Sequence, residues 1–152
     1  FEVEPYCVKV FRQRWYMVGR SVADEKIRIY SLDRICNLQE TDKKFIYPKD
    51  FDPQKYFAAS FGIIVDEDYD VEKVRVRVYG NKCKYLRALP LHASQKEGKP
   101  EKDCTVFEYR LRPTYDFRQE LLSYGDEVEV LEPQWFREEM QQIAKQMHEY
   151  YE

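Results

Sequence analysis

The stretch from Glu4 to Leu38 constrains the fold more than any other part of the chain. It contains three short runs that are rich in β-branched and aromatic residues, namely Tyr6–Arg12, Trp15–Gly19 and Ile27–Leu32. Polar breaks separate these runs at residues 13–14 and 20–26. Alternating runs with short polar breaks are typical of antiparallel hairpins, so we predict a small curled sheet at this end of the chain.

The third run indicates how its side chains divide between the two faces of the sheet. Side chains alternate along a strand, which groups Ile27, Ile29 and Ser31 on one face. The opposite face then takes Arg28, Tyr30 and Leu32. We therefore predict a sheet on which aromatic and arginine side chains share a face.

Composition limits the classes of protein to which this chain can belong. Its 152 residues suffice for one ordinary domain or two small ones, and a net charge of -3 argues against a basic nucleic-acid binder. The charge is unevenly distributed, however. Residues 5–20 carry Lys9, Arg12, Arg14 and Arg20 with no acidic residue. Such a basic strip is either an anion or phosphate site or a solvated strand face, and both interpretations remain open.

Metal, disulfide and membrane chemistry find little support in the sequence. The 4 cysteines lie far apart without a C-x-x-C pair, and the chain has only 2 histidines, His92 and His148. We expect no metal, no cofactor and free thiols in a reducing cytoplasm. No segment approaches the length that spans a membrane. No nucleophile–base arrangement or phosphate-binding glycine loop is present, so we do not expect an enzyme.

The remainder of the chain predicts alternating helices and strands. Asp52 followed by Pro53 is typical of a helix start, which predicts a helix over Pro53–Ser60. The elements predicted after it are a strand at Glu72–Tyr79, a helix at Asn81–Leu89, strands at Leu91–Lys96 and Cys104–Arg112, a helix at Tyr115–Ser123, a strand at Glu127–Leu131 and a helix at Pro133–Tyr151. This order is that of a ferredoxin-like βαββαβ domain with an extra C-terminal helix, and the predicted fold class is α+β.

Two domains and a linker follow from this pattern. We place the first domain at residues 1–61, an acidic linker at 62–71 and the second domain at 72–152. The chain starts at Phe1 within strand-like sequence, so we expect a fragment that lacks at least an opening strand. Asp116, Glu120, Glu138 and Glu139 are expected to be acids on helix surfaces.

The first part of the chain resembles the WYL domain of bacterial transcriptional regulators. The signature stands here as Trp15-Tyr16-Met17, and Met17 replaces leucine with little change of volume. Further matching residues are Pro5-Tyr6 upstream and Arg28, Tyr30, Asp33, Arg34 and Ile35 downstream. The second part resembles the C-terminal extension of this family, through residues 89–95 and 123–133.

This resemblance implies a small Sm-like or SH3-like antiparallel β-barrel followed by the ferredoxin-like domain. It also implies an effector-sensing region that takes a nucleotide or a single-stranded nucleic acid. Promoter DNA would be bound only through an N-terminal helix-turn-helix domain, which this sequence does not contain. We expect Trp15 in the barrel core and Tyr16 on its surface, because adjacent strand residues point to opposite faces.

Nine basic and aromatic residues form the predicted effector site on the barrel. They are Tyr6, Lys9, Arg12, Arg14, Tyr16, Arg20, Arg28, Tyr30 and Arg34. Guanidinium groups match phosphate oxygens, and a tyrosine ring can stack on a base. In the alternative interpretation Arg20, Arg28 and Arg34 pair with Asp33 or Glu25 on an exposed sheet. A second functional hypothesis is a dimerisation scaffold without a ligand, since the last helix has an apolar stripe that suits a homodimer.

Overall fold

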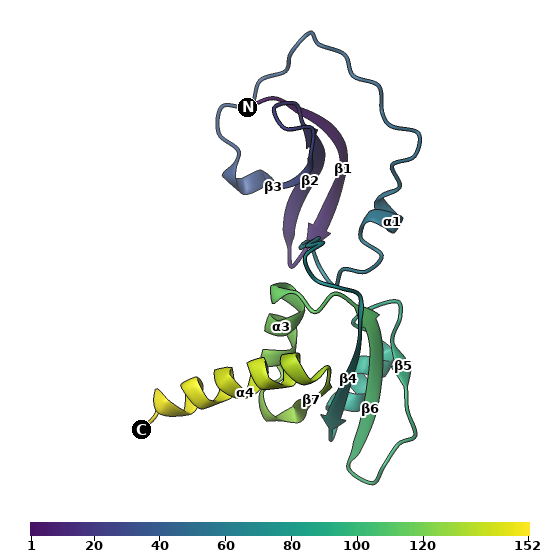
Figure 1. Cartoon of the computed structure of the whole chain (residues 1–152), viewed down its shortest axis with the longest axis vertical. Coiled ribbons are helices and arrows are strands. Elements are labelled where there is room, and N and C mark those ends of the chain that lie inside the picture. Colours follow the sequence, from purple (N-terminus) through teal and green to yellow (C-terminus); the bar gives the residue numbers. More distant parts are fainter. The chain divides into compact units, whose positions relative to one another are not determined.

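The computed structural model describes all residues from Phe1 to Glu152 and contains two compact units (Figure 1). The first unit is Phe1–Phe57 and the second is Ala58–Glu152. An antiparallel sheet of three strands lies in the first unit and one of four strands lies in the second. The α+β class is therefore confirmed. The predicted limits of the domains and linker, 1–61, 62–71 and 72–152, stay a prediction.

The first unit contains the three strands that the sequence predicts. They are β1 (Val3–Phe11), β2 (Arg14–Ser21) and β3 (Ile27–Ser31), and they pair in the order β1-β2-β3. The turn between β1 and β2 is formed by Arg12 and Gln13, whose φ angles are +45° and +64°. Positive φ at both residues of a two-residue turn matches the twist of a tight hairpin.

The sheet of the first unit is open, and the predicted closed barrel is not formed. Besides the strands, this unit contains only η1 (Leu32–Arg34) and α1 (Pro53–Tyr56), because residues 35–52 form neither helix nor strand. Three strands are too few to close on themselves. The prediction that Trp15 is a core residue is wrong, because the open sheet leaves this side chain 57% exposed.

The helix at Pro53 is shorter than predicted. As expected, Asp52 caps it by accepting hydrogen bonds from the backbone N–H groups of Gln54 and Lys55. The helix nevertheless ends at Tyr56 rather than Ser60. Short helices are marginally stable without packing. Ala58, two residues after the last helical residue, already belongs to the second unit.

Tyr6 links β1 to the segment that precedes and includes α1. Its ring centroid lies 5.4 Å from that of Tyr47 and 5.0 Å from that of Phe51. Phe51 in turn contacts Tyr56 at 5.7 Å, and Tyr56 contacts Phe57 at 5.0 Å. These rings supply the apolar packing that a small open sheet lacks on its own.

Gly19 allows β1 and β2 to approach closely. A Cβ atom at this position would lie 2.6 Å from the Glu4 carbonyl oxygen and 2.7 Å from a methyl group of Val3. We expect Gly19→Ala to lower the free energy of unfolding of the first unit by about 2 kcal/mol, because the backbone must move apart. Trp15 fluorescence during urea unfolding, in a Trp135→Phe background, measures this effect. Val10→Ala on the same sheet is the control, and an equal loss in both variants would contradict the expectation.

The second unit contains the longer series of elements. In chain order they are β4 (Glu72–Tyr79), α2 (Lys82–Ala88), β5 (Lys96–Glu97), β6 (Cys104–Leu111), α3 (Tyr115–Leu122), η2 (Gly125–Glu127), β7 (Val128–Glu132) and α4 (Gln134–Glu149). The strands pair in the order β5-β6-β4-β7, with antiparallel neighbours throughout. The strict alternation of Glu72–Tyr79 predicted β4 correctly to both ends.

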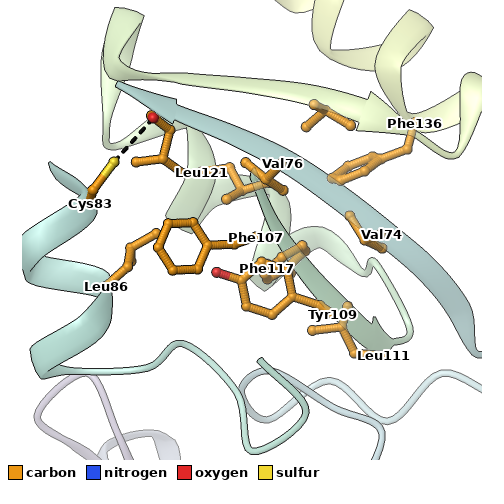
Figure 2. Packing of buried hydrophobic residues seen from close by; sticks show 12 residues of the cluster. Val74, Val76, Cys83, Leu86, Phe107, Tyr109, Leu111, Phe117, Leu121 and Phe136 are labelled. Carbon is orange, nitrogen blue, oxygen red and sulfur yellow. Dashed lines mark hydrogen bonds between the residues drawn. The ribbon is translucent and has the colours of Figure 1, made fainter. Parts of the chain in front are cut away.

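One face of this sheet carries the main hydrophobic core (Figure 2). The strands contribute Val74, Val76, Val78, Phe107, Tyr109, Leu111 and Val130. The three helices cover them with Cys83 and Leu86 from α2, Phe117 and Leu121 from α3, and Phe136 from α4. Burial raises the pKa of Tyr109, whose hydroxyl donates to the Gln95 side chain at 3.0 Å.

The strand predicted over Leu91–Lys96 is wrong for most of its length, because β5 contains only Lys96 and Glu97. Side chains replace the backbone pairing before it. Ser94 Oγ accepts from the Arg110 N–H at 2.8 Å and donates to the Arg110 carbonyl at 3.2 Å. Gln95 Oε1 accepts from the Leu91 N–H, and Gln95 Nε2 donates to the Leu86 carbonyl. These bonds hold a compact turn where the sequence suggests a strand.

Asp116 is a buried residue rather than the helix-surface acid that we expected. Its side chain is a hydrogen-bond hub and the residue is only 6% exposed. Oδ2 accepts from the backbone N–H groups of Ile63 and Ile64, at 3.0 and 3.2 Å. Oδ1 accepts from the Thr114 hydroxyl and the Phe117 N–H, at 2.6 and 2.9 Å. Asp116 thereby fixes the segment at residues 63–64 to the start of α3.

Glu129 on β7 holds three donors on the opposite face of the sheet. It accepts from Arg137 at 2.7 Å, from Tyr79 at 3.0 Å and from Arg77 at 2.9 Å. These hydrogen bonds, that of Arg137 first, lower the pKa of Glu129 below its ordinary value. Because the folded pKa is lowered, the stabilisation is present above the unfolded pKa and disappears as the pH falls through the folded one.

Glu129→Gln is therefore expected to lower the stability of the second unit by about 1 kcal/mol at neutral pH, a modest figure because the side chain is partly exposed. The difference from the wild type should shrink to nothing as the pH falls below the ordinary range of a glutamate. Urea unfolding followed by Trp135 fluorescence, in a Trp15→Phe background, measures it. Glu138→Gln is the control, and a difference that persists unchanged in acid would contradict this account.

Candidate functional site

The nine predicted effector residues do not share one face of the first sheet. The pairing register places Lys9 opposite Tyr16 and Arg28 opposite Gly19. Directly paired residues point to the same side, so two faces can be defined. The Tyr16 face carries Lys9, Arg14, Tyr16 and Arg20, and the Trp15 face carries Trp15, Met17, Arg28 and Tyr30. Arg28 and Tyr30 share a face as predicted, but Arg20 lies on the other.

Arg20 and Arg28 nevertheless lie at the same end of the sheet. Arg20 pairs with Ile27 and Gly19 pairs with Arg28, so the two arginines occupy adjacent rows beside the loop that joins β2 to β3. We call residues 22–26 the β2–β3 loop. The loop is held by a hydrogen bond from the Ser21 N–H to the Lys26 carbonyl at 2.9 Å. The register thus places two guanidinium groups at the same end of the sheet, one on each face.

The guanidinium group of Arg20 forms ion pairs with two carboxylates. Its Nη1 donates to Glu4 at 3.2 Å, and its Nη2 donates to Glu25 at 2.6 Å. The Glu4 side chain is 23% exposed and the Glu25 side chain is 75% exposed. Tyr6 also donates to Glu4, and burial together with this carboxylate raises the Tyr6 pKa. Arg20 therefore has one enclosed partner and one partner in water.

Arg28 and Tyr30 are the predicted residues of the Trp15 face. Arg28 Nη2 forms an ion pair with Asp24, and the Arg28 side chain remains 52% exposed. This hydrogen bond, followed by one from Ser21, lowers the pKa of Asp24. The ring of Tyr30 stacks on that of Phe1, with centroids 5.2 Å apart and an interplanar angle of 17°. The Phe1 ring therefore occupies one side of the Tyr30 ring.

The remaining basic residues lie elsewhere. Arg14 lies 3.6 Å from Asp33, whose pKa is lowered by a hydrogen bond from Ser31 and, to a lesser extent, by the nearby arginines Arg14 and Arg34. Arg12 lies over the ring of Phe11 at the β1–β2 turn, and the ammonium of Lys9 lies 4.0 Å from the centre of the Phe57 ring. Arg20 pairs with Glu25 as in the ion-paired alternative, whereas Asp33 pairs with Arg14 and Arg28 pairs with Asp24.

Two residues beside the arginines were missed by sequence reasoning, namely Glu4 and Asp24. Glu4 lies in the first strand, and its role appears only once β1 is paired with β2. The sequence does hold one signal for Asp24, which precedes Arg28 by four positions across a polar break. That spacing suggests a contact on a helix, but a tight loop brings the same two side chains together here.

The structure holds no group of three or more histidine, cysteine, aspartate and glutamate residues that is placed to bind a metal ion. The two ring nitrogens of His92 already have partners, since Nδ1 lies 2.8 Å from Ser94 Oγ in its own turn and Nε2 lies 3.0 Å from the Ala58 carbonyl oxygen. None of the helices is both long and apolar enough to span a bilayer.

Comparison with known proteins identifies both parts of the chain. The family model of the WCX domain matches residues 70–148, and that of the WYL domain matches residues 1–40. The search of curated proteins found no match. A solved structure similar to this chain is that of proteasome accessory factor B/C (PafBC) of Arthrobacter aurescens, with 23% sequence identity and a TM-score of 0.35. The similarity covers 89% of this chain and 20% of that one.

Proposed function

We propose, because this chain belongs to the family defined by the WYL and WCX domains, that it is the effector-sensing region of a cytoplasmic bacterial transcriptional regulator. Membership of this family supports a regulatory role related to nucleic acids. The effector in this proposal is a nucleotide or a single-stranded nucleic acid. It binds the first unit through basic and aromatic side chains, and promoter DNA is bound by a separate domain.

The observation that carries this proposal is that Arg20 and Arg28 lie in adjacent rows at the end of the sheet beside the β2–β3 loop, one on each face. Each guanidinium group can bind the oxygens of a phosphate bidentately. Tyr30 lies two residues from Arg28 on the same face, and its ring already accepts a stacked partner. A phosphate contact beside a stacking ring is the combination with which proteins hold single strands.

The Trp15 face adds apolar surface next to this combination. Val8, Val10 and Trp15 are 53%, 52% and 57% exposed. Trp15 and Tyr30 are diagonal neighbours, since Tyr30 pairs with Met17 two residues from Trp15. The second cluster of basic residues, at Arg12, Arg14 and Arg34, lies at the other end of the sheet. A strand of nucleic acid that follows the sheet would reach both clusters.

Binding of labelled single-stranded DNA and RNA, measured by fluorescence anisotropy, tests the proposal. Affinity should fall steeply between about 50 mM and about 200 mM salt, because phosphate contacts release counterions. Arg28→Ala should weaken binding about tenfold or more, since it removes one charge-assisted contact. A nucleoside monophosphate that competes with the labelled strand would identify the smaller effector. Affinity that is indifferent to salt would refute phosphate recognition.

Lys99→Ala is the matched control for Arg28→Ala. Lys99 is an exposed residue of the second unit, in the loop between β5 and β6, and its replacement changes the net charge by the same amount. Binding that both variants lose equally would indicate a general attraction to positive charge rather than a site at the loop.

A dimerisation scaffold is the second candidate function, and the surface of α4 favours it. Phe136 is completely buried, but further along the same helix Met147 is 49% exposed and Tyr150, which follows its last residue, is 75% exposed. Figure 1 shows the C-terminal end of this helix extending away from the sheet. An apolar stripe at this spacing matches the seam of a helix pair, and the occupant in this proposal is a second copy of the chain.

Deletion of residues 134–152 would not test the scaffold, because it removes Phe136 from the core. Ile143 precedes Met147 by four residues on α4 and is partly buried, but it does not belong to the core cluster. Ile143→Glu combined with Met147→Glu therefore charges the stripe without removing a core residue. Sedimentation analysis should then give a monomer for the variant and a dimer for the wild type, with effector binding unchanged. A wild-type chain that is monomeric at every concentration would exclude the scaffold.

We also propose which known folds the two units resemble. The strand order β5-β6-β4-β7 supports a ferredoxin-like arrangement of the second unit. The first unit would be an Sm-like or SH3-like sheet. Limited proteolysis tests the linker at 62–71, since the protease should cut the exposed residues 67–70 before it cuts within either unit.

A further inference from the structure

We propose that the β2–β3 loop is an anionic gate, in which Asp24 and Glu25 occupy Arg28 and Arg20 until the phosphates of an effector displace them. This inference rests on the proposed function and concerns the regulation of the same site. The two carboxylates stand where phosphate oxygens would bind. The free energy of effector binding is then the difference between the contacts that the effector makes with the arginines and the ion pairs that the loop gives up.

The arrangement of the loop supports this role. Residues 24 and 25 are consecutive, yet they reach arginines on opposite faces of the sheet. Glu25 has a φ angle of +58°, and its N–H donates to the Ser21 carbonyl at 2.9 Å. The backbone of the loop is therefore fixed in a conformation that sends one acid to each arginine.

The two ion pairs are suited to displacement. Exposed ion pairs contribute little because water and salt screen them. The Glu25 side chain is the more exposed of the two acids, at 75% against 34% for Asp24. Asp24 is held more firmly, since Lys26 N–H and the Ser21 side chain also donate to it. Glu25 should thus release Arg20 more readily than Asp24 releases Arg28.

Glu4 keeps Arg20 in position, so that Glu25 can leave and return to the same guanidinium group. It remains bonded to Arg20 and Tyr6 on the Tyr16 face when Glu25 leaves, so Arg20 stays positioned on β2. Arg20 then has one Nη free for a phosphate oxygen. A guanidinium group binds phosphate oxygens bidentately as it binds a carboxylate, so a phosphate can take the position that Glu25 leaves.

The test compares affinities for a fluorescently labelled oligothymidylate, using the whole chain. Asp24→Asn and Glu25→Gln keep the size and the hydrogen-bonding oxygen of each side chain while removing its charge. We expect the double variant to bind about fivefold or more tightly than the wild type, as expected when a competing ion pair is lost.

Glu2→Gln is the matched control for the removal of negative charge. Glu2 lies in the same unit, and its carboxylate pairs with Lys43 at 2.7 Å rather than with Arg20 or Arg28. The Glu2→Gln substitution changes the net charge by the same amount as Asp24→Asn or Glu25→Gln alone. A loop variant that binds no more tightly than Glu2→Gln would overturn the gate, because the gain would then reflect overall charge only.

A second background separates this inference from the proposed function. In an Arg20→Gln/Arg28→Gln chain, the loop substitutions should bring no gain, since there is no arginine to release. Wild-type binding without any gain from the loop variants overturns the gate and leaves the proposed function standing. Absence of binding by both the wild type and the double loop variant overturns both.

Discussion

Asp116→Ala is expected to lower the free energy of unfolding of the second unit by about 3 kcal/mol. Two backbone N–H groups of the segment at Ile63 and Ile64 lose their acceptor, as do the Thr114 hydroxyl and the Phe117 N–H. Leaving buried donors without partners costs about 1–3 kcal/mol for each group that water cannot reach. Urea unfolding followed by Trp135 fluorescence in a Trp15→Phe background measures this loss.

Asp68→Ala is the matched control, because Asp68 is an exposed aspartate in the turn at residues 66–69. It should change stability by less than about 0.5 kcal/mol. A similar loss in both variants would mean that Asp116 does not hold the segment that leads into this unit.

Phe117→Ala is expected to cost about 4 kcal/mol in the same unit, the largest effect of any substitution considered. The ring is completely buried and joins three parts of the fold. It contacts Phe61 at 5.6 Å, Tyr109 on β6 at 5.7 Å and Phe136 on α4 at 6.3 Å. Removing it leaves a cavity in the core that Figure 2 shows, where Phe117, Tyr109 and Phe136 are labelled.

Phe117→Leu separates the loss of volume from the loss of the ring. We expect it to cost about 1–2 kcal/mol, because most of the apolar contact is retained. Tyr115→Ala on the same helix is the surface control, since Tyr115 is 58% exposed. Trp15 fluorescence in a Trp135→Phe background should report little change in the first unit. If alanine at 117 were tolerated as well as alanine at 115, the description of the core would be wrong.

Strands whose hydrophobic and polar residues alternate were predicted from the sequence. Turns that are held by side-chain hydrogen bonds were not. The alternation of Glu72–Tyr79 and Cys104–Leu111 is a backbone property that periodicity reports directly. At Leu91–Gln95 the same type of pattern is misleading. Ser94 and Gln95 satisfy the backbone of neighbouring elements there, and no periodicity encodes such bonds. Burial of Asp116 likewise depends on a segment fifty residues away.

The candidate site shows the same limit. Alternation along β3 placed Arg28 and Tyr30 together correctly, but it carries no information about β2. Only the pairing register reveals that Arg20 points to the other face. Trp15 and Tyr16 were expected on opposite faces, and they are. Which face is covered depends on the closure of the sheet, which is a property of the whole unit, and Trp15 was therefore misplaced.

The dependence of oligonucleotide affinity on salt tests the central claim most directly. It should be measured for the wild type and for Arg20→Gln/Arg28→Gln. Each phosphate contact on a single strand contributes about 0.7 to the slope of log affinity against log salt, so loss of two contacts should reduce the slope by about 1.4. That result would place the phosphates of the effector at the β2–β3 loop. An unchanged slope in the double variant, with wild-type binding intact, would contradict the account.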